Sequence, residues 1–385
     1  MKVAYLCPNG FIGGAERFVL EVSDGHNKFG SFTPTIIFFN YGPAVDEAKS
    51  RGIEVIVLTQ RFRLSRPLSL FKAVRELRSI FKSQDFALYN ATMPYSHIVG
   101  SLASLGLKIK RTWYQHGPVA GTLDLIATLF KVEQVYFNSD YTLKTHNNSL
   151  IIRKPCFPDE VIPIGIPEKT SDKATVQSIR EEFIPQGGKL ILMAGRITSW
   201  KGFATGVQAF LKVKPRKPEE DVKLIIVGDI TSNRDLPYKE LLLKLIEGSN
   251  KDKDKEKGKG KSVLFLGRKE NIGDYMAAAD IFLHCSTTPE PFGLVIAEAM
   301  KQGTLVVGSS KGGTQDILID GITGFSFDST SEEAIENLIP VLQKALVVEG
   351  GQVAKKGKEH IDKNFSIINM TNKIESEFQK VLSNE

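Results

Sequence analysis

Two glutamates, Glu290 and Glu298, lie on either side of Gly293 in a segment that could bind an anionic ligand. The segment 290–300 is rich in Leu, Ala and Met and lies between two apolar runs, so it indicates the crossover helix of a β-α-β unit. Gly293 leaves room for a ligand to approach the free N–H groups of the helix start, which attract phosphate.

The spacing of the two glutamates suits a nucleotide. Glu298 lies about five residues into the expected helix, roughly 7 Å from the anion, where its carboxylate could accept both hydroxyls of a ribose. Glu290 precedes the helix, where the rest of the ligand would lie. The alternative is an ordinary buried helix that carries two surface glutamates.

Two cations, Arg196 and Lys201, follow another apolar run, in the segment Gly195–Gly202. Arg can hold a phosphate through two N–H groups, whereas Lys acts as a compact charge. Together they could stabilise a diphosphate leaving group without a metal ion. The alternative is a surface Arg and Lys beside a turn.

The first half offers two weaker signals. Gly13 and Gly14 follow the first apolar run and would let the backbone approach a phosphate or a sugar. His116 ends a later run and would point into a cleft, although a lone histidine is usually a polar loop residue. His284 lies inside an apolar run and is interpreted as a core histidine.

The elements that must position these residues are read from the apolar runs. Continuous apolar runs separated by helix-like stretches are typical of parallel sheets covered on both faces. The runs span residues 3–7, 35–39, 54–58, 86–89, 112–115 and 134–137 in the first half, and 189–194, 223–227, 262–266, 280–285 and 304–307 in the second. Ligands bind beyond the carboxyl ends of such strands, so we expect two Rossmann-like α/β domains that face each other across a cleft.

The motifs resemble those of a known family. Glu290–Met300 reads Glu-Pro-Phe-Gly-Leu-Val-Ile-Ala-Glu-Ala-Met, and Gly13–Arg17 reads Gly-Gly-Ala-Glu-Arg. With Gly-Arg and Lys-Gly in Gly195–Gly202, the chain is similar to retaining GT-B glycosyltransferases of family four, the glycosyltransferase group 1 type. The similarity is dense over residues 189–325, whereas the first domain matches only at its glycine loop and at His116. The chain departs from the family at Gly312–Asp316 and at Ile164, where Asn is common.

The resemblance implies the GT-B fold, with domains over 1–168 and 169–365 and a C-terminal helix over 366–385 that crosses back to the first domain. It implies metal-independent transfer of a sugar, with retention, from a nucleotide diphosphate sugar, UDP-sugar favoured, to a glycan, lipid-linked or small-molecule acceptor. No cofactor besides this donor substrate is expected. The implied catalytic residues are His116, Arg196, Lys201 and Glu290. The implied donor-binding residues are Gly13, Gly14, Gly228, Asp229, Arg268, Lys269, Phe292, Gly293, Leu294 and Glu298.

Two alternatives stay open at this point: a GT-B sugar epimerase or phosphorylase, and a nucleotide-sugar-binding protein without catalysis. The first would act without an acceptor or would need phosphate.

The biological process expected for this chain is polysaccharide or lipopolysaccharide biosynthesis.

Composition and charge indicate the class of protein and its cellular compartment. The chain has 385 residues, of which 42% are hydrophobic and 24% charged, as in ordinary globular proteins. No apolar run reaches the roughly 18 residues of a membrane span. Its three scattered cysteines give neither a disulfide framework nor a metal site and fit a reducing cytoplasm. Residues 1–165 carry 19 basic and 13 acidic residues, so the whole net charge of +6 lies there and suits an anionic partner.

Two charged stretches are set apart from the strands and helices of the sheets. Residues 251–261 read as a solvated loop, and without interleaved aromatic residues they do not indicate nucleic-acid binding. Residues 61–82 hold seven basic residues and one acidic residue, with Leu70, Val74, Leu77 and Phe81 on one helix face. This stretch is either a sheet-covering helix with a basic solvent face or a patch that contacts an anionic membrane peripherally.

Overall fold

The computed structural model describes residues 1–119, 121–168, 171–213, 221–251, 262–348 and 350–383. The chain divides into two compact units, Met1–Pro167 with Phe365–Glu385, and Glu168–Asn364. The predicted loop at 251–261 lies outside the described residues, apart from the backbone of residue 251.

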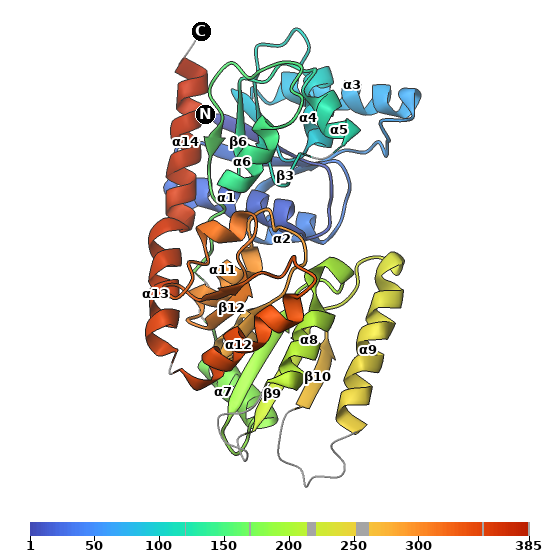
Figure 1. Ribbon diagram of the computed structural model, residues 1–385. Coiled ribbons are helices and arrows are strands. Elements are labelled where there is room, and N and C mark those ends of the chain that lie inside the picture. Colours follow the sequence, from blue (N-terminus) through green and yellow to red (C-terminus); the bar gives the residue numbers. More distant parts are fainter. Residues whose placement is uncertain (120, 169–170, 214–220, 252–261, 349, 384–385) are drawn as a thin grey trace. The chain divides into compact units, whose positions relative to one another are not determined.

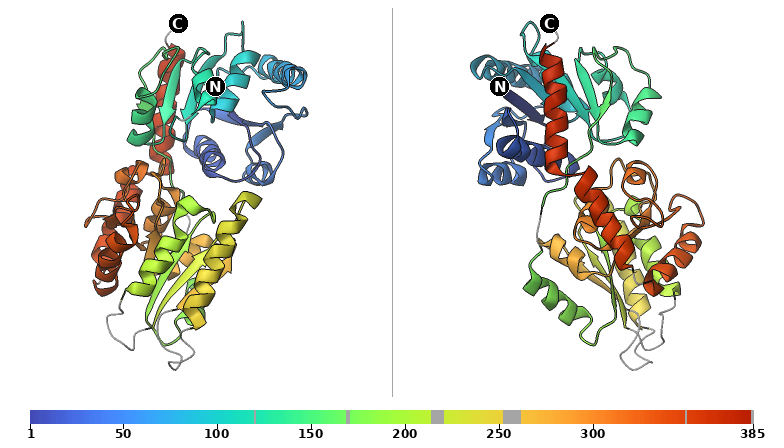
Figure 2. Two further views of the ribbon diagram at one scale, coloured as in Figure 1. Left: turned by 45° about the vertical axis from the view of Figure 1, so that its right-hand side comes forward. Right: turned by 90° about the vertical axis from the view of Figure 1, so that its left-hand side faces the viewer.

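The first unit is a parallel sheet that helices cover on both faces (Figures 1 and 2). Within the described residues its strands are β1 Lys2–Cys7, β2 Thr33–Phe38, β3 Glu54–Val57, β4 Leu88–Ala91, β5 Lys110–Gln115, β6 Gln134–Phe137 and β7 Glu160–Val161. Its helices are α1 Gly14–Phe29, α2 Pro43–Ser50, α3 Pro67–Ser83, α4 Pro94–Ala103, α5 Thr122–Ala127, α6 Asp140–Asn147 and α14 Ile367–Ser383. The strand order is β3-β2-β1-β4-β5-β6-β7, with Lys2 of β1 opposite Thr33 and Val3 opposite Leu88.

The second unit repeats the plan. Its strands are β8 Lys189–Ala194, β9 Val222–Val227, β10 Ser262–Gly267, β11 Ile281–His284, β12 Leu305–Ser309 and β13 Phe325–Phe327, in the order β10-β9-β8-β11-β12-β13. Its helices are α7 Lys173–Phe183, η1 Ser199–Lys201, α8 Phe203–Lys212, η2 Asn233–Asp235, α9 Leu236–Lys251, α10 Ile272–Ala278, α11 Leu294–Lys301, η3 Gly313–Asp316, α12 Ala334–Val347 and α13 Gly351–Asn364. Helix α8 packs against α9 and α12, while α10 packs against α7 and α11, and α11 against α13.

Every apolar run named above forms a strand of one of these two sheets. The strands pair in parallel and are largely buried, which is why their sequences are continuously apolar rather than alternating. The predicted α/β class with two Rossmann-like units is therefore confirmed. The cleft expected between the units stays a prediction.

Helix α14, red in Figure 1, packs against α1 in the first unit. Phe378 of α14 lies against the rings of Phe32 and Tyr136, with centroids 5.6 and 6.0 Å away. The carboxylate of Glu375 accepts hydrogen bonds from Nδ1 of His26, at 2.6 Å, and from the backbone N–H of Ser31, at 2.9 Å. The last helix is thus part of the core of the first unit.

Candidate functional site

Lys201 and Glu290 form an ion pair in the second unit. Nζ of Lys201 lies 2.5 Å from Oε1 of Glu290, and only 15% and 8% of the two side chains are exposed. Lys201 ends η1, just beyond β8, and Gly202 follows it with φ of 65°. A Cβ at Gly202 would lie 2.0 Å from the backbone oxygen of Cys285, so glycine is needed where η1 approaches the end of β11.

The carboxylate of Glu290 has two further partners. Nε2 of His284 lies 3.0 Å from Oε1, and the hydroxyl of Ser286 donates to the same oxygen. Burial alone would raise the pKa of Glu290, but the hydrogen bond from His284 and the charge of Lys201 hold the pKa of this carboxyl well below its usual range. Glu290 is therefore ionised at neutral pH and forms a largely buried ion pair with Lys201.

Trp200 brings the second cation to the same place. The guanidinium carbon of Arg196 lies 5.9 Å from the centroid of the Trp200 ring, and Nζ of Lys201 lies 4.3 Å from it. Both distances are within the range of cation–π attraction. Arg196 is exposed, whereas Lys201 is largely buried, so the two predicted cations stand beside one ring with different access to solvent.

The start of α11 is supported by the glycine loop that departs from the family pattern. Gly293 precedes α11 with φ of 104°, which a residue with a Cβ would rarely adopt. The N–H of Gly313 donates to the backbone oxygen of Glu290 at 2.7 Å, and a Cβ at Gly313 would lie 2.1 Å from the oxygen of Pro291. Gly312 and Gly313 are thus what allows this loop to fit against the segment that carries Glu290.

The predicted donor-binding residues at and before the start of α11 differ in their exposure to solvent. Phe292 is 3% exposed, so only its backbone could meet a ligand, while Leu294 and Glu298 are half-buried. Glu298 is the fifth residue of α11, as expected.

The end of β9 lies next to that of β8, and the end of β10 follows on the other side of β9. The N–H of Gly228 donates to the oxygen of Gly267 at 2.9 Å, and Gly228 takes φ of 149°, close against Gly195. Asp229 accepts from Nζ of Lys239 at 2.7 Å, and this hydrogen bond lowers its pKa. Arg268 and Lys269 are exposed after β10. These predicted residues therefore share one sheet edge with Arg196 and Lys201 but form no side-chain hydrogen bond or ion pair with them among the described residues.

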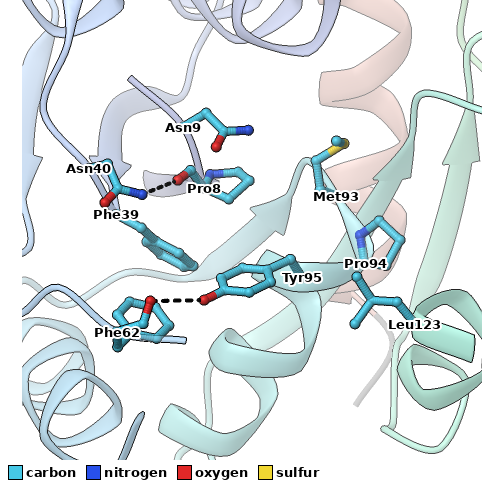
Figure 3. A pocket seen from close by; sticks show the side chains of 9 residues that line it. All are labelled: Pro8, Asn9, Phe39, Asn40, Phe62, Met93, Pro94, Tyr95 and Leu123. Atoms are coloured by element: carbon cyan, nitrogen blue, oxygen red, sulfur yellow. Dashed lines mark hydrogen bonds between the residues drawn. The ribbon is translucent and has the colours of Figure 1, made fainter. Parts of the chain in front are cut away.

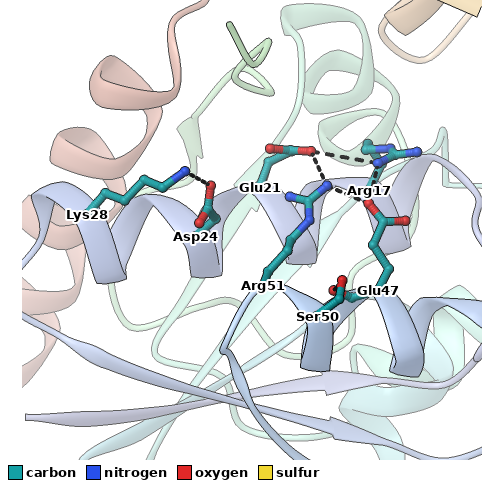
Figure 4. Close-up of polar contacts among 7 residues, drawn as sticks. All are labelled: Arg17, Glu21, Asp24, Lys28, Glu47, Ser50 and Arg51. Carbon is teal, nitrogen blue, oxygen red and sulfur yellow. Dashed lines mark hydrogen bonds and ion pairs between the residues drawn. The ribbon is translucent and has the colours of Figure 1, made fainter. Parts of the chain in front are cut away.

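The glycine motif of the first unit begins α1. Gly13 precedes the helix, Gly14 is its first residue, and Glu16 accepts a hydrogen bond from the N–H of Gly13 at 3.1 Å. Arg17 of the same motif pairs with Glu47 of α2, at 2.8 Å, in the cluster drawn in Figure 4. Arg17 thus joins two helices.

His116 lies beyond the end of β5 at the carboxyl edge of the first sheet. Its ring contacts Tyr114 and Phe18, with centroids 4.6 and 5.0 Å away. Burial of the ring lowers the pKa of His116 to about 3, so it is neutral at pH 7. Its Nε2 is buried and has no hydrogen-bond partner within the described residues. A neutral imidazole with an unused nitrogen can bind a sugar hydroxyl.

The structure thus joins Lys201, Glu290 and, through Trp200, Arg196, and it places His116, Gly13 and Gly14 in the other unit. The sequence interpretation did not include His284, Ser286 or Trp200 among the functional residues. His284 is buried, as a core histidine would be, but its ring also binds Glu290. Its position at the carboxyl end of a strand was the signal that could have identified it.

Comparison with known proteins shows what this chain is similar to. Residues 176–344 match the family described as "Glycosyl transferases group 1". The lipopolysaccharide 1,2-N-acetylglucosaminetransferase of Salmonella typhimurium is 26% identical over 230 residues, which cover 59% of this chain and 58% of that protein. The putative glycosyltransferase YtcC of Bacillus subtilis is 21% identical over the full chain and 93% of its own length. The alignments with the first three curated relatives span only 58%, 48% and 38% of their lengths.

Solved structures extend the likeness to both units. Anabaena Alr3699/HepE, in complex with UDP and glucose, has a TM-score of 0.81 at 21% identity and covers 98% of this chain and 99% of its own. A glycosyltransferase of Rickettsia africae has a TM-score of 0.84 at 22% identity, with 100% and 99% covered. These likenesses show the GT-B fold. Residues 176–344, in the second unit, therefore match the glycosyl transferases group 1 family, as the motifs there predicted.

Proposed function

We propose that this chain transfers a sugar from a nucleoside diphosphate sugar to a hydroxyl group of an acceptor, with retention at the anomeric carbon. The observation that carries the proposal is the buried pair of Lys201 and Glu290, with Arg196 beside it on Trp200. The ammonium group of Lys201 has three N–H donors, of which one is directed at Glu290. The others, with Arg196 and the backbone start of α11, would bind the diphosphate.

The chemistry follows from where charge develops. As the bond from the anomeric carbon to the phosphate oxygen breaks, negative charge grows on the diphosphate, and two fixed cations stabilise it. The acceptor hydroxyl attacks from the same face and gives its proton to the departing phosphate oxygen. His116, neutral and with an unused Nε2, would bind a hydroxyl of the transferred sugar. Glu298 would hold the ribose.

A UDP-sugar is the favoured donor. The Anabaena relative of known structure was solved with UDP, with UDP and glucose, and with UDP-glucose, which supports this choice. Because the proposed site already supplies two cations and a helix start, we propose that transfer needs no metal ion and no cofactor. Activity that is lost in excess EDTA and restored by Mg²⁺ or Mn²⁺ would contradict this.

Calorimetry with UDP-, GDP- and ADP-sugars tests the donor, and NMR of the product tests retention. Arg196→Ala should lower turnover about 10²–10³-fold, the usual effect of losing one charge-stabilising donor. Lys212→Ala, at an exposed lysine of α8, is the matched control, because among the described residues its ion pair is with the exposed Glu336 alone. Binding without any turnover would favour a non-catalytic nucleotide-sugar-binding protein. Turnover without an acceptor, or only with phosphate, would favour the epimerase or phosphorylase.

A second proposal concerns α3, which we propose contacts an anionic membrane surface. The predicted apolar stripe is confirmed: Leu77 and Phe81 are buried, and Leu70 and Val74 pack against the same core. None of the helices in the described part of the chain combines the length and apolar character that a membrane span requires. Contact would therefore be peripheral.

The opposite face of α3 mixes apolar and basic side chains. Leu68 and Phe71 are 83% and 65% exposed, and Lys72 and Arg75 share their face at helical spacing. Arg78 is engaged with the backbone oxygen of Ala103 at 2.9 Å, so it belongs to the fold. Exposed apolar side chains among cations are typical of interfacial helices, and each cation adds about 1 kcal/mol at an anionic surface.

Sedimentation with anionic and with neutral vesicles, at low and at physiological salt, tests this contact. The chain should bind only the anionic vesicles, and less at higher salt. Leu68→Ser with Phe71→Ser should weaken binding, while Leu105→Ser, at another exposed leucine, should not. Failure to bind either kind of vesicle would leave α3 as a basic helix in solvent.

A further inference from the structure

We propose that a pocket in the first unit binds an uncharged sugar ring of the acceptor, and that it selects against a phosphorylated one. This inference rests on the proposed function and names the chemical class of the acceptor. The pocket has a volume of about 330 Å³. Figure 3 shows the side chains that line it: Pro8, Asn9, Phe39, Asn40, Phe62, Met93, Pro94, Tyr95 and Leu123.

The pocket lies where this kind of sheet binds ligands. In the order β3-β2-β1-β4-β5 the direction of winding reverses between β1 and β4, and ligands bind beyond the carboxyl ends at that point. Asn9 follows β1, Asn40 follows β2, and Tyr95 follows β4. The pocket is therefore made by the loops that this topology brings together.

Its lining is aromatic and uncharged. Phe62 and Tyr95 stack with ring centroids 5.8 Å apart, and Phe39 lies 5.6 Å from Phe62. None of the nine lining residues carries a charge. An anion in this pocket would lose its hydration without gaining an ion pair from the lining, which is costly. Burial raises the pKa of Tyr95, and the charge that opposes this rise is that of Arg63, which is exposed and outside the lining.

Two of the lining side chains, Asn9 and Asn40, are amides. Nδ2 of Asn40 donates to the backbone oxygen of Pro8 at 2.8 Å, which uses one of its two N–H groups and fixes the orientation of this amide. The amide oxygens can accept hydrogen bonds from a ligand. A sugar hydroxyl can donate to these oxygens and also accept from a remaining N–H group, whereas an ionised phosphate can only accept.

Saturation-transfer NMR on the full chain tests directly which chemical class of ligand the pocket binds. The probes are methyl α- and β-D-glucopyranoside, methyl galactopyranosides, glucose 6-phosphate and octanol. We expect the neutral glycosides to bind, and Tyr95→Leu and Asn40→Ala to weaken their binding about three- to tenfold, the worth of an aromatic contact or one hydrogen bond. Tyr41→Leu is the matched control, since this 64% exposed tyrosine adjoins Asn40 but does not line the pocket.

Three results would overturn the inference: binding of glucose 6-phosphate alone, binding of octanol alone, or no binding of any probe. Equal loss in the Tyr41→Leu control would do the same. Calorimetry with UDP on the same samples tests the proposed function separately, because the proposed donor residues Lys201 and Glu298 belong to the other unit. A chain that binds UDP but no neutral glycoside keeps the proposed function and loses this inference.

Discussion

Replacing Lys201 by methionine should separate its structural role from its proposed catalytic role. Methionine keeps an apolar stem against Trp200 but removes the charge that lies 2.5 Å from Glu290. Among the described residues, the carboxylate would then keep His284 and Ser286 as its partners. Breaking a fully buried pair costs about 3–5 kcal/mol. Since 15% of Lys201 is exposed, we expect a loss somewhat below that range, about 2–3 kcal/mol, in the free energy of unfolding.

The double variant Lys201→Met/Glu290→Gln decides between the two roles. It removes both charges, so stability in urea unfolding should recover to within about 1 kcal/mol of the original chain. Turnover should stay about 10²–10³-fold low, because nothing replaces the cation at the diphosphate. Lys212→Met serves as the control on an exposed ion pair.

Two results would refute this reasoning, one from the double variant and one from Lys201→Met alone. If the double variant regains normal turnover and normal affinity for UDP in calorimetry, Lys201 serves only to balance Glu290, and the diphosphate assignment is wrong. If Lys201→Met alone leaves stability unchanged, the ion pair does not contribute as its burial implies.

Three further predictions follow from single residues. Glu298→Ala should weaken UDP binding by about 1.5–3 kcal/mol, the worth of hydrogen bonds to a charged group, and calorimetry that finds unchanged affinity would place the ribose elsewhere. Burial lowers the pKa of His97 to about 3, against about 6.5 when unfolded. The unfolded chain therefore binds more protons between these values, and stability should fall by about 2 kcal/mol from pH 8 to pH 5 through this residue. His97→Phe should reduce this fall in the free energy of unfolding between pH 8 and pH 5, measured by urea unfolding at each pH. An unchanged fall would count against the assignment. Glu375→Ala removes the acceptor of His26 and Ser31 and should cost about 2–4 kcal/mol, seen as faster hydrogen exchange in α14. Unchanged exchange in α14 would show that this carboxylate does not hold the helix in place.

The strands were predictable because buried parallel strands are continuously apolar. The sequence interpretation missed β7 Glu160–Val161 and β13 Phe325–Phe327, since two or three residues at a sheet edge leave too short a pattern. Both short strands lie at the ends of their sheets, where pairing on one side suffices.

The candidate site was predictable only in part. Glu290 and Lys201 were named from their motifs, but their contact was not, because 89 residues separate them in the sequence. His284 lies only six residues from Glu290, but both meet Lys201 because β11 is the neighbour of β8 in the sheet. Sequence spacing shows what lies on one helix face, whereas strand order decides which loops meet.

Because α14 belongs to the first unit, the first unit is completed after the second one during synthesis. The second unit is one continuous segment, Glu168–Asn364, whereas the first unit needs residues from both sides of it. On the ribosome, the second unit is therefore fully synthesised before the first unit has all of its parts. Until Phe378 emerges, the rings of Tyr5, His26, Phe32 and Tyr136 lack the partner that covers them in the finished protein. The core of the first unit is thus the last to be covered. A nascent or truncated chain would expose that aromatic surface to chaperones and to other chains.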